Sequence, residues 1–366
     1  MKKTLVLLLC ILLTVMTVLP ALADSDMDFR YAARVDTFSE DGLALFQARN
    51  GLYGYVNTEG EVSIPPTFQR ASYFQDGIAL VYNGALYGLI DTTGAMVADY
   101  QWPDAYPFSE GLAAVQNADG TWGYIDNTGA QVISLANYEF SGYYDYPRSF
   151  ENGVAEVRAT SGTVYIDRTG KECSLENAAY PSAALFTIEK VENTSNYNVY
   201  CNGAFVGKFY KDWGALTHEY IEPVQGADNL WVINADDDHL YDAAANRLLM
   251  MHMDDISDVC SDGRIRVRDE MVDWFVDVTG SMAIPPVESA YDFSCGYAVV
   301  SRQCAAYDVL GNASAVTRYG YMDTNGNVFG EYEEANPFVN GYAIIKDYGK
   351  YEVISTDYFV DYWGEG

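Results

Sequence analysis

The sequence lacks the patterns that mark the common enzyme classes. It contains no Gly-x-Ser-x-Gly, His-Glu-x-x-His, Gly-x-x-x-x-Gly-Lys-Ser/Thr or Gly-x-Gly-x-x-Gly. Those patterns supply a serine nucleophile, a zinc site, a phosphate loop and a dinucleotide loop. No two cysteines are separated by two residues, which gives no support to zinc or thioredoxin-type chemistry. We therefore expect no enzyme activity, no cofactor and no bound metal.

Basic residues are also scarce. The chain has 21 Lys and Arg against 52 Asp and Glu, and its formal net charge is −31. Such a field repels nucleic acid, so a nucleic-acid partner is not expected. The composition is nevertheless not that of a disordered acidic chain, because 49% of the residues are hydrophobic and 31 are tyrosine. Aromatic residues at this level, with 31 glycines between them, indicate β-structure.

Only the N-terminus carries a long hydrophobic run, from Leu5 to Leu19 after Lys2 and Lys3. At about 15 residues the run is shorter than the roughly 20 that span a bilayer. Ala21-Leu22-Ala23 follows and fits signal peptidase. We predict a signal peptide over 1–23, cleaved before Asp24. Residues 24–366 would then be extracytoplasmic, either secreted or associated with the cell surface, without stable membrane insertion.

Cysteines are few after that cleavage, and their number is odd. An odd count predicts at least one free thiol or an intermolecular bond, and spacing does not show the pairing. Two of them flank the start of an apparent insertion, where a disulfide would clamp it. The five are Cys173, Cys201, Cys260, Cys295 and Cys304.

A phrase of about 35 residues recurs along the chain, with anchor glycines at 42, 77 and 111. Its first half reads Phe-x-x-Gly-x-Ala and its second half reads Trp/Tyr-Gly-x-x-Asp-x-x-Gly. Clear copies cover about 33–175 and 256–357, and degenerate copies cover about 178–250, so repeats fill 24–366. An insertion around 303–316 stretches one copy. The motif positions are marked by Gly54, Gly88, Asp91, Trp122, Gly123, Asp126, Asp277 and Gly320.

Each copy predicts a meander of three or four antiparallel strands. In the clearest copy, residues 112–115 and 122–125 are short apolar runs joined by Ala-Asp-Gly at 118–120, a turn tripeptide. Residues 126–129 reverse the chain again, and 131–133 supply a third strand. One such unit cannot bury its own apolar face, so neighbouring units must stack.

These residues resemble the bacterial WG-containing repeat family, also called KWG repeats. The resemblance covers nearly all of residues 24–366 and rests on a motif that recurs in register. Only Trp122-Gly123 keeps the literal Trp-Gly; tyrosine replaces the tryptophan at 53, 87 and 319, and Trp274 is followed by Phe275. The resemblance implies a β-rich repeat protein, often exported, without established catalytic residues.

Two all-β architectures fit tandem units of three to four strands. The units close into a propeller-like ring, or they stack into an open β-solenoid. Closure hides the edges of the sheets, and no charged capping unit is evident at either end of the array. The propeller-like ring is therefore the favoured architecture.

The repeated aspartates superficially resemble the Asp-Thr-Gly of aspartic proteases. Here one more residue separates Asp from Gly, and the run occurs once in each copy, so we interpret Asp91, Asp126 and Asp277 as turn residues. A second acidic stretch lies at 236–239 and continues with His252, Asp254 and Asp255. Its spacing matches no metal-ligand motif, and a solvated turn is the favoured interpretation.

The large number of tyrosines has the clearest functional interpretation. Most of the tyrosines are expected in the core, whereas exposed ones stack on sugars or contact protein partners. The first candidate for a ligand-binding patch is the link that contains Tyr138, Tyr143, Tyr144 and Tyr146, and the insertion after Gly296 is the second.

The favoured function is a non-catalytic extracytoplasmic scaffold for protein interactions, with an unknown protein or glycan of the cell surface as partner. The alternative is a glycan or cell-wall binding module. A hydrolase with an unrecognised carboxylate site is the remote alternative, because 52 acidic residues always supply pairs. Aromatic residues along a groove favour glycan, and a large apolar patch without a groove favours protein.

Overall fold

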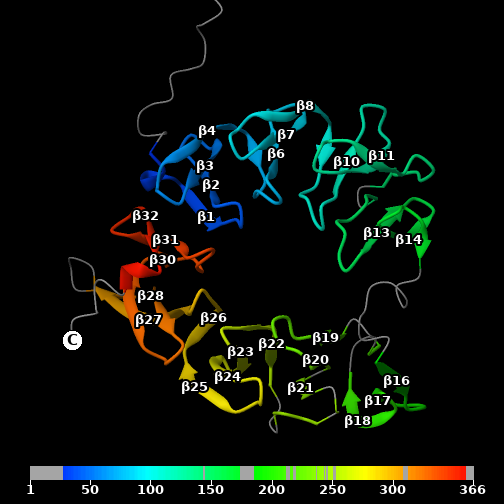
Figure 1. Ribbon diagram of the computed structural model, residues 1–366, viewed down its shortest axis with the longest axis vertical. Helices are drawn as coiled ribbons and strands as arrows, with labels where there is room; N and C mark the ends of the chain where they lie inside the picture. The colour runs from blue at the N-terminus through cyan, green and yellow to red at the C-terminus, as the bar shows by residue number, and fades with distance from the viewer. Residues whose placement is uncertain are drawn as a thin grey trace, which may run out of the picture.

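The described residues form nine small antiparallel sheets that follow one another around a ring (Figure 1). The computed structural model describes residues 28–142, 145–173, 185–211, 215–216, 220–235, 237–242, 244, 246–249, 253–307 and 312–359. Each sheet has three or four strands in sequence order. The predicted all-β class of tandem three- to four-stranded repeats is confirmed. We call the sheets units 1 to 9.

Units 1 to 4 contain the first fifteen strands, after a short 3-10 turn, η2 (Phe29–Tyr31). Unit 1 comprises β1 (Arg34–Phe38), β2 (Leu43–Gln47), β3 (Tyr53–Asn57) and β4 (Val62–Phe68), and unit 2 comprises β5 (Arg70–Ala71), β6 (Ile78–Tyr82), β7 (Tyr87–Asp91) and β8 (Met96–Trp102). Unit 3 comprises β9 (Asp104–Ala105), β10 (Ala113–Gln116), β11 (Trp122–Ile125) and β12 (Gln131–Ser134), and unit 4 comprises β13 (Val154–Ala159), β14 (Gly162–Asp167) and β15 (Glu172–Cys173).

Units 5 to 9 complete the ring. Units 5 and 6 comprise β16 (Phe186–Lys190), β17 (Asn196–Cys201) and β18 (Ala204–Tyr210), then β19 (Ile221–Pro223), β20 (Leu230–Asn234) and β21 (Asp238–Asp242). Unit 7 comprises β22 (Asp255–Ser261), β23 (Arg264–Asp269), β24 (Val272–Val276) and β25 (Met282–Val287). Units 8 and 9 comprise β26 (Ser289–Ser294), β27 (Tyr297–Tyr307), β28 (Ala313–Asp323) and β29 (Val328–Tyr332), then β30 (Glu334–Ala335), β31 (Tyr342–Asp347) and β32 (Lys350–Ser355).

The repeated aspartates close the turn after the third strand of a unit. The Oδ1 atom of Asp126 accepts hydrogen bonds from the Thr128 N–H at 2.9 Å and the Thr128 hydroxyl at 2.6 Å. Gly129 follows with a φ of 80°, which glycine adopts without strain. The hydrogen bond from the Thr128 side chain, followed by that from its backbone, lowers the pKa of Asp126. Asp91 and Asp277 make the same contacts with Thr93 and Thr279.

The motif glycines occupy equivalent positions in their units. Each is the residue of a third strand that lies opposite a hydrophobic residue of the second strand. A Cβ at Gly54 would lie 2.6 Å from the Ile64 carbonyl oxygen, because a bulge of the next strand crosses over the glycine. The pairs are Gly54 with Phe46, Gly88 with Val81, Gly123 with Val115, and Gly320 with Val300.

The two halves of the motif meet between neighbouring units. The buried Tyr55 of unit 1 packs against Phe74 of unit 2, with ring centroids 4.7 Å apart, and its hydroxyl donates to the Ser72 carbonyl at 2.7 Å. Burial strongly raises the pKa of Tyr55, so the hydroxyl stays protonated and acts as a donor. Equivalent pairs at 4.8 Å are Tyr124 with Phe150, Phe275 with Phe293, and Tyr321 with Phe338. At these four contacts, a unit thus completes its core with the next one.

The first and last units are joined in the same way. Val35 and Phe46 of unit 1 share one buried cluster with Ile344 and Tyr351 of unit 9. The Asn340 side-chain amide also donates to the Glu40 carbonyl at 3.0 Å. These contacts bring the two ends of the array together, as Figure 1 shows for β1 and β31. The ring predicted in preference to an open solenoid is confirmed.

The contact between units 4 and 5 differs from the others. Eight buried clusters in the described residues each join two neighbouring units, and none of them joins these two. Glu156 faces Tyr165 across the strands of unit 4, as Ala114 faces Tyr124 in unit 3. The carboxylate pairs with Arg158 at 2.8 Å. A charged residue therefore replaces the buried alanine on the side of unit 4 that faces unit 5.

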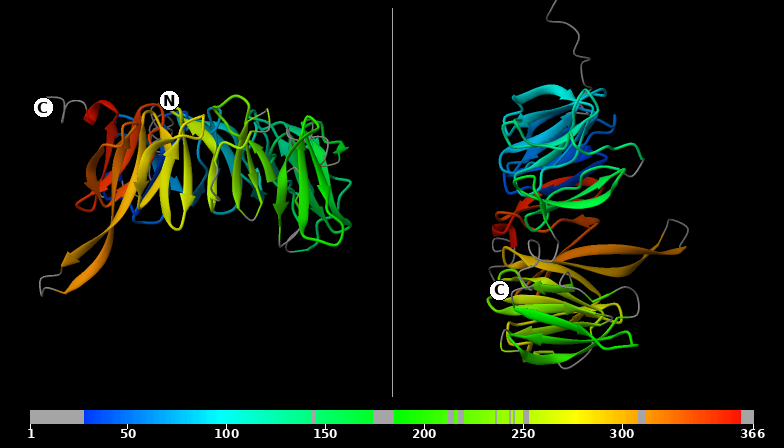
Figure 2. Two further views of the ribbon diagram at one scale, coloured as in Figure 1. Left: turned by 90° about the horizontal axis from the view of Figure 1, so that it is seen from below. Right: turned by 90° about the vertical axis from the view of Figure 1, so that its right-hand side faces the viewer.

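The insertion around 303–316 forms an arm. It lengthens β27 and β28, which pair without interruption from Tyr297–Asp323 to Tyr307–Ala313. Both views in Figure 2 show this hairpin extending well beyond one face of the ring. We call residues 302–307 and 313–318 the arm. No disulfide clamps it: Cys295 lies in the turn before β27 and Cys304 lies opposite Val316, and none of the five cysteines is in a disulfide.

Candidate binding site

The described part of the predicted tyrosine patch belongs to the contact between units 3 and 4. Tyr138 and Tyr146 are half-buried against the cluster that joins these units. The Tyr146 ring stacks on Tyr106 with centroids 5.3 Å apart, and the Tyr138 hydroxyl donates to Glu172 at 2.9 Å. Burial, followed by that hydrogen bond, raises the pKa of Tyr138. Tyr143 and Tyr144 lie outside the described residues.

The acidic and His-containing stretch does not gather into a metal centre in the part of the chain that the structure describes. Asp238 accepts the Ile256 N–H, Asp254 accepts the Glu270 N–H, and Asp255 pairs with Arg266. Asp236 and His252 lie outside the described residues.

Among the residues that the structure describes, no helix is long and apolar enough to cross a membrane.

The register of the strands corrects the alignment of unit 7. Phe275 pairs with Ile284 as Tyr124 pairs with Ile133, which places Asp273, not Trp274, at the position of Trp122. Aligning the two units on their Asp-x-x-Gly turns gives the same result. Aligning Trp274 with Trp122 instead shifts the two sequences by one residue. In unit 6 the same position is occupied by Asp238, the first residue of β21, four positions before Asp242 at the end of that strand.

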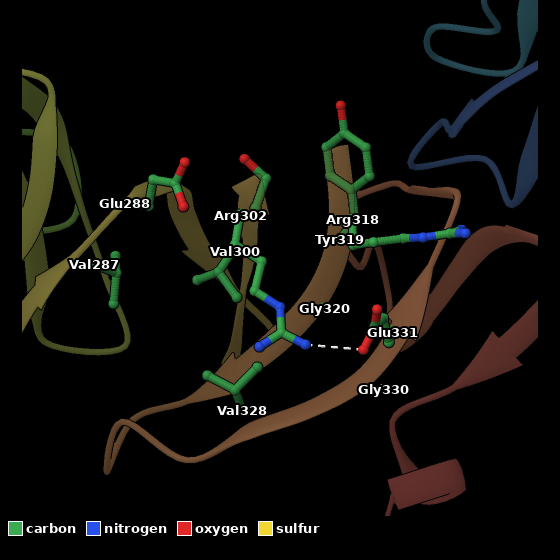
Figure 3. Close-up of a pocket in the computed structure, with 11 residues that line it drawn as sticks. Val287, Glu288, Val300, Arg302, Arg318, Tyr319, Gly320, Val328, Gly330 and Glu331 are labelled. Carbon is green, nitrogen blue, oxygen red and sulfur yellow. Dashed lines mark hydrogen bonds and ion pairs between the residues drawn. The ribbon is translucent and has the colours of Figure 1, made fainter. Parts of the chain in front are cut away.

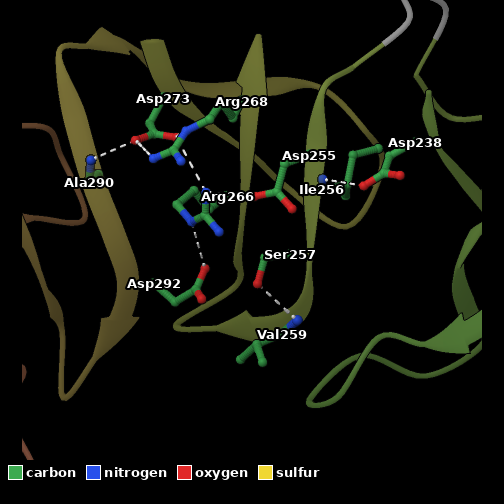
Figure 4. A network of polar contacts seen from close by, with 10 residues as sticks. All are labelled: Asp238, Asp255, Ile256, Ser257, Val259, Arg266, Arg268, Asp273, Ala290 and Asp292. Atoms are coloured by element: carbon green, nitrogen blue, oxygen red, sulfur yellow. Dashed lines mark hydrogen bonds and ion pairs between the residues drawn. The ribbon is translucent and has the colours of Figure 1, made fainter. Parts of the chain in front are cut away.

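Asp238 and Asp273 each form a hydrogen bond to the next unit. Each side chain accepts the first-strand N–H of the next unit: Asp238 from Ile256 at 3.0 Å, and Asp273 from Ala290 at 2.8 Å (Figure 4). A hydrogen bond thus replaces the hydrophobic contact that Trp122 makes in unit 3.

Their electrostatic surroundings differ. Asp273 is fully buried and binds Arg268 through both oxygens, at 2.9 and 2.8 Å, with Arg266 at 3.3 Å. Burial raises the pKa of Asp273, but the hydrogen bonds from Arg268 and Ala290 outweigh it, and the net pKa is lowered. Asp238 has no such arginine among the described residues. Burial raises its pKa to about 6 in spite of the hydrogen bond from Ile256, with Asp255 and Glu222 adding to the rise and Lys211 opposing it.

Asp238 therefore makes stability depend on pH, and replacing it should remove that dependence. Between its ordinary pKa of 3.8 and about 6, the folded protein binds a proton that the unfolded chain has lost, so stability falls as pH rises through this window. Asparagine keeps an acceptor oxygen without charge. We expect Asp238→Asn to raise the free energy of unfolding at pH 7.5 by about 1 to 2 kcal/mol, discounted for partial exposure.

Urea titrations at pH 4.5 and 7.5, followed by tryptophan fluorescence, measure this. The variant should gain stability at the higher pH and little at the lower. An equal loss at both pH values would show that the carboxylate contributes a favourable interaction that asparagine does not replace.

A groove of about 370 Å³ lies at the base of the arm (Figure 3). Valines form its apolar part, and charged residues with one tyrosine stand around them. The Arg302 guanidinium donates to Glu331 at 2.8 Å across the groove. The lining comprises Val287, Glu288, Val300, Ser301, Arg302, Arg318, Tyr319, Gly320, Val328, Gly330 and Glu331.

The hairpin tips on either side of the arm expose large apolar side chains. Met271 lies between β23 and β24 of unit 7 and is 85% exposed, and Tyr348 lies between β31 and β32 of unit 9 and is 89% exposed. Both are in two-residue turns with left-handed backbone, with φ of 70° at Met271 and 46° at Tyr348. Such turns favour Gly and Asn, and other residues cost on the order of 1 kcal/mol.

Arm, groove and tips together are the candidate binding face: the groove lies at the base of the arm, and the two tips belong to units 7 and 9, which flank unit 8 in the chain. The sequence indicated the arm through its insertion but not the groove or the tips. One signal was available: residues 302–318 hold two arginines and one aspartate, in a chain of net charge −31.

In the part of the chain that the structure describes, nine antiparallel sheets follow one another around a ring, and eight buried clusters each join two neighbouring sheets. This arrangement defines a propeller-like repeat protein. The chain contains WG containing repeats: the model of that repeat family matches residues 53–86, 87–120 and 319–351. No match was found among curated proteins.

Two solved structures resemble the chain at low identity. One is a crystal structure of the eukaryotic initiation factor, 12% identical with a TM-score of 0.49, covering 88% of this chain and 97% of that chain. The other is the WD40 β-propeller domain of Doa1, 11% identical with a TM-score of 0.27, covering 91% of this chain and 94% of that chain.

Proposed function

We propose that the protein is a non-catalytic extracytoplasmic scaffold that binds a partner protein on the face formed by the arm and its two flanking tips. The observation that carries this proposal is the pair Met271 and Tyr348. Both expose large apolar surface to water, and both stand at turn positions where Gly or Asn would be more stable. Local strain of this kind is characteristic of functional sites.

Two substitutions separate binding from stability. Met271→Gly and Tyr348→Asn create turns that fit the left-handed backbone, since the second yields Asn-Gly with Gly349. We expect the double variant to unfold at higher temperature, with about 1 kcal/mol gained at each site. Capture of the partner from cell-surface extract by cross-linking should fall about tenfold, as expected for losing binding-face anchors.

The matched control is Tyr291→Asn, which removes a tyrosine that is 55% exposed in the first strand of unit 8, away from the tips. It should leave capture unchanged. Equal capture by the double variant and the unmodified protein would contradict the proposed face.

Export is the second part of the proposal and rests on the run from Leu5 to Leu19 and the Ala21-Leu22-Ala23 site. N-terminal sequencing of the protein recovered outside the cell should begin at Asp24. Recovery of the whole chain in the cytoplasm, with residues 1–23 attached, would contradict export.

A glycan is the second candidate ligand, favoured by the groove alone. Tyr319 stands there beside Glu288, Arg302 and Glu331, and aromatic faces next to charged hydrogen-bonding groups suit sugars. A glycan-array screen with residues 24–366 tests it. Binding that is lost in Tyr319→Ala but kept in the Met271→Gly/Tyr348→Asn variant would favour the glycan over the protein partner.

A further inference from the structure

The arm has two outer edges, and only one of them is capped. Beyond Ser301, β27 has no β26 partner, and before Tyr319, β28 has no β29 partner. The Gln303 N–H on the β27 edge donates to both carboxylate oxygens of Glu288 at 3.1 Å. The β28 edge has no such cap among the described residues.

The register shows which groups this free edge presents. Gln303 lies opposite Thr317, and its N–H points out of the hairpin toward Glu288. In an antiparallel pair of strands, two residues opposite each other direct their backbone N–H and C=O groups either both into the hairpin or both out of it. Inward and outward pairs alternate along the strands. The N–H and C=O groups of Thr317, Ala315 and Ala313 therefore point outward from β28. They are spaced as a further strand requires.

This edge also lacks the features that protect natural edge strands. Charged side chains, prolines and bulges normally prevent a further strand from pairing. Residues 313–317 read Ala-Ser-Ala-Val-Thr, without charge or proline. They pair with β27 without a bulge. Ala313 and Ala315 are exposed, so no bulky side chain obstructs the approach.

Arg318 supplies a charge at the inner end of the edge. It lies directly opposite Arg302, and like charges in this position repel each other. Arg302 is neutralised by Glu331 at 2.8 Å, whereas Arg318 forms no ion pair within the described residues. An anionic group of a ligand beside Arg318 would supply the counter-charge that Arg318 lacks among the described residues.

The occupant is better accounted for by a peptide than by a second copy of the chain. Pairing two β28 edges would join only these few residues, far short of the roughly 1,200 Å² that a stable interface buries. Two copies would also bring together two bodies of charge −31. A peptide meets the arm itself, where residues 302–318 are net positive, and the body is screened beyond about 8 Å at physiological salt.

We propose that the outer edge of β28 takes up an extended peptide segment of the partner protein as an additional strand, with a carboxylate of that segment on Arg318. Main-chain hydrogen bonds would provide affinity, and Arg318 would provide selectivity. This inference rests on the proposed function and specifies how the face is used.

Two proline variants test the edge. Ala305 and Ala315 lie opposite each other, and their N–H groups point out of opposite edges of the arm. Proline at either position removes an outward N–H without removing a bond within the arm. The probe is a fluorescent, end-blocked peptide of alternating Thr and Val with one Glu, and fluorescence anisotropy measures its binding. Ala315→Pro should weaken binding about tenfold or more, and Ala305→Pro should leave it unchanged.

A second pair of changes tests the charge. Replacing Glu with Gln in the peptide should weaken binding about tenfold, the value of a charge-assisted hydrogen bond. Arg318→Gln should bind the Glu and Gln peptides equally. Arg302→Gln is the control and should still discriminate between them, because Glu331 already neutralises Arg302.

Three results would each overturn the inference. Ala305→Pro and Ala315→Pro could weaken binding equally, or the unmodified protein could fail to bind the probe peptide. The third is a concentration-dependent dimer of the protein that Ala315→Pro abolishes. If Ala315→Pro leaves partner capture intact while Met271→Gly/Tyr348→Asn removes it, the inference fails and the proposed function stands. If neither variant affects capture, both fail.

Discussion

Replacing Asp273 with asparagine should destabilise the protein by about 3 kcal/mol, the usual cost of removing one partner from a buried ion pair. Asparagine keeps an oxygen for the Ala290 N–H, so the hydrogen bond between units 7 and 8 can persist. The two contacts to Arg268 lose their charge, and Arg266 is left between Asp255 and Asp292. The midpoint of urea unfolding, followed by tryptophan fluorescence, should fall accordingly.

Asp238→Asn is the matched control, because both aspartates occupy the same place in their units and accept the same kind of hydrogen bond. At pH 7.5 the two variants should shift stability in opposite directions. The sign follows from the pKa of each group, which is lowered at Asp273 and raised at Asp238. Equal destabilisation in both would contradict this explanation, because the opposite pKa shifts of the two aspartates predict opposite signs.

The lowered pKa of Asp273 also predicts its behaviour in acid. Its stabilising contribution is present above the unfolded-state pKa near 3.8 and is lost only as pH falls through the lower folded-state pKa. The difference in stability between the protein and Asp273→Asn should therefore be constant above about pH 5 and shrink below pH 4.

Replacing Gly54 with alanine should cost about 3 kcal/mol, at the upper end for overpacking a core. The added Cβ would meet the Ile64 carbonyl oxygen at 2.6 Å and the Pro66 nitrogen at 2.7 Å. These are backbone atoms of the bulge in β4 and cannot rotate away. Thermal unfolding of Gly54→Ala should therefore begin at clearly lower temperature than that of the unmodified protein.

The control for Gly54 lies three residues earlier. Gly51 has a φ of 87° in an exposed turn, with no atom within 4 Å of an added Cβ, and asparagine tolerates such a backbone. Gly51→Asn should unfold almost as the unmodified protein does. Gly320→Ala, whose nearest backbone atom lies at 3.0 Å, should be intermediate. A loss at Gly51 equal to that at Gly54 would contradict the close-approach explanation.

The repeats were predictable because their signals are local. Gly129 and Asp126 specify a turn through bonds that span only four residues. The candidate face was only partly predictable, because it depends on neighbours. The sequence predicted Tyr146 as a binding residue, and the structure adds that its ring stacks on Tyr106 of unit 3. The sequence did not single out Met271; its exposure and its backbone angle do so.

The sequence by itself determined that the chain forms tandem β units, because the period of the glycines, the aspartate turns and the apolar runs are each set by contacts within one unit. Only the tertiary structure decided that Val35 and Ile344 share a core, so that the array is a ring. Only the tertiary structure showed that Asp273 binds the Ala290 N–H of the next unit and that β28 has no β29 partner before Tyr319. These features depend on register and on contacts between distant residues, where one shift in pairing exchanges the buried and exposed side chains.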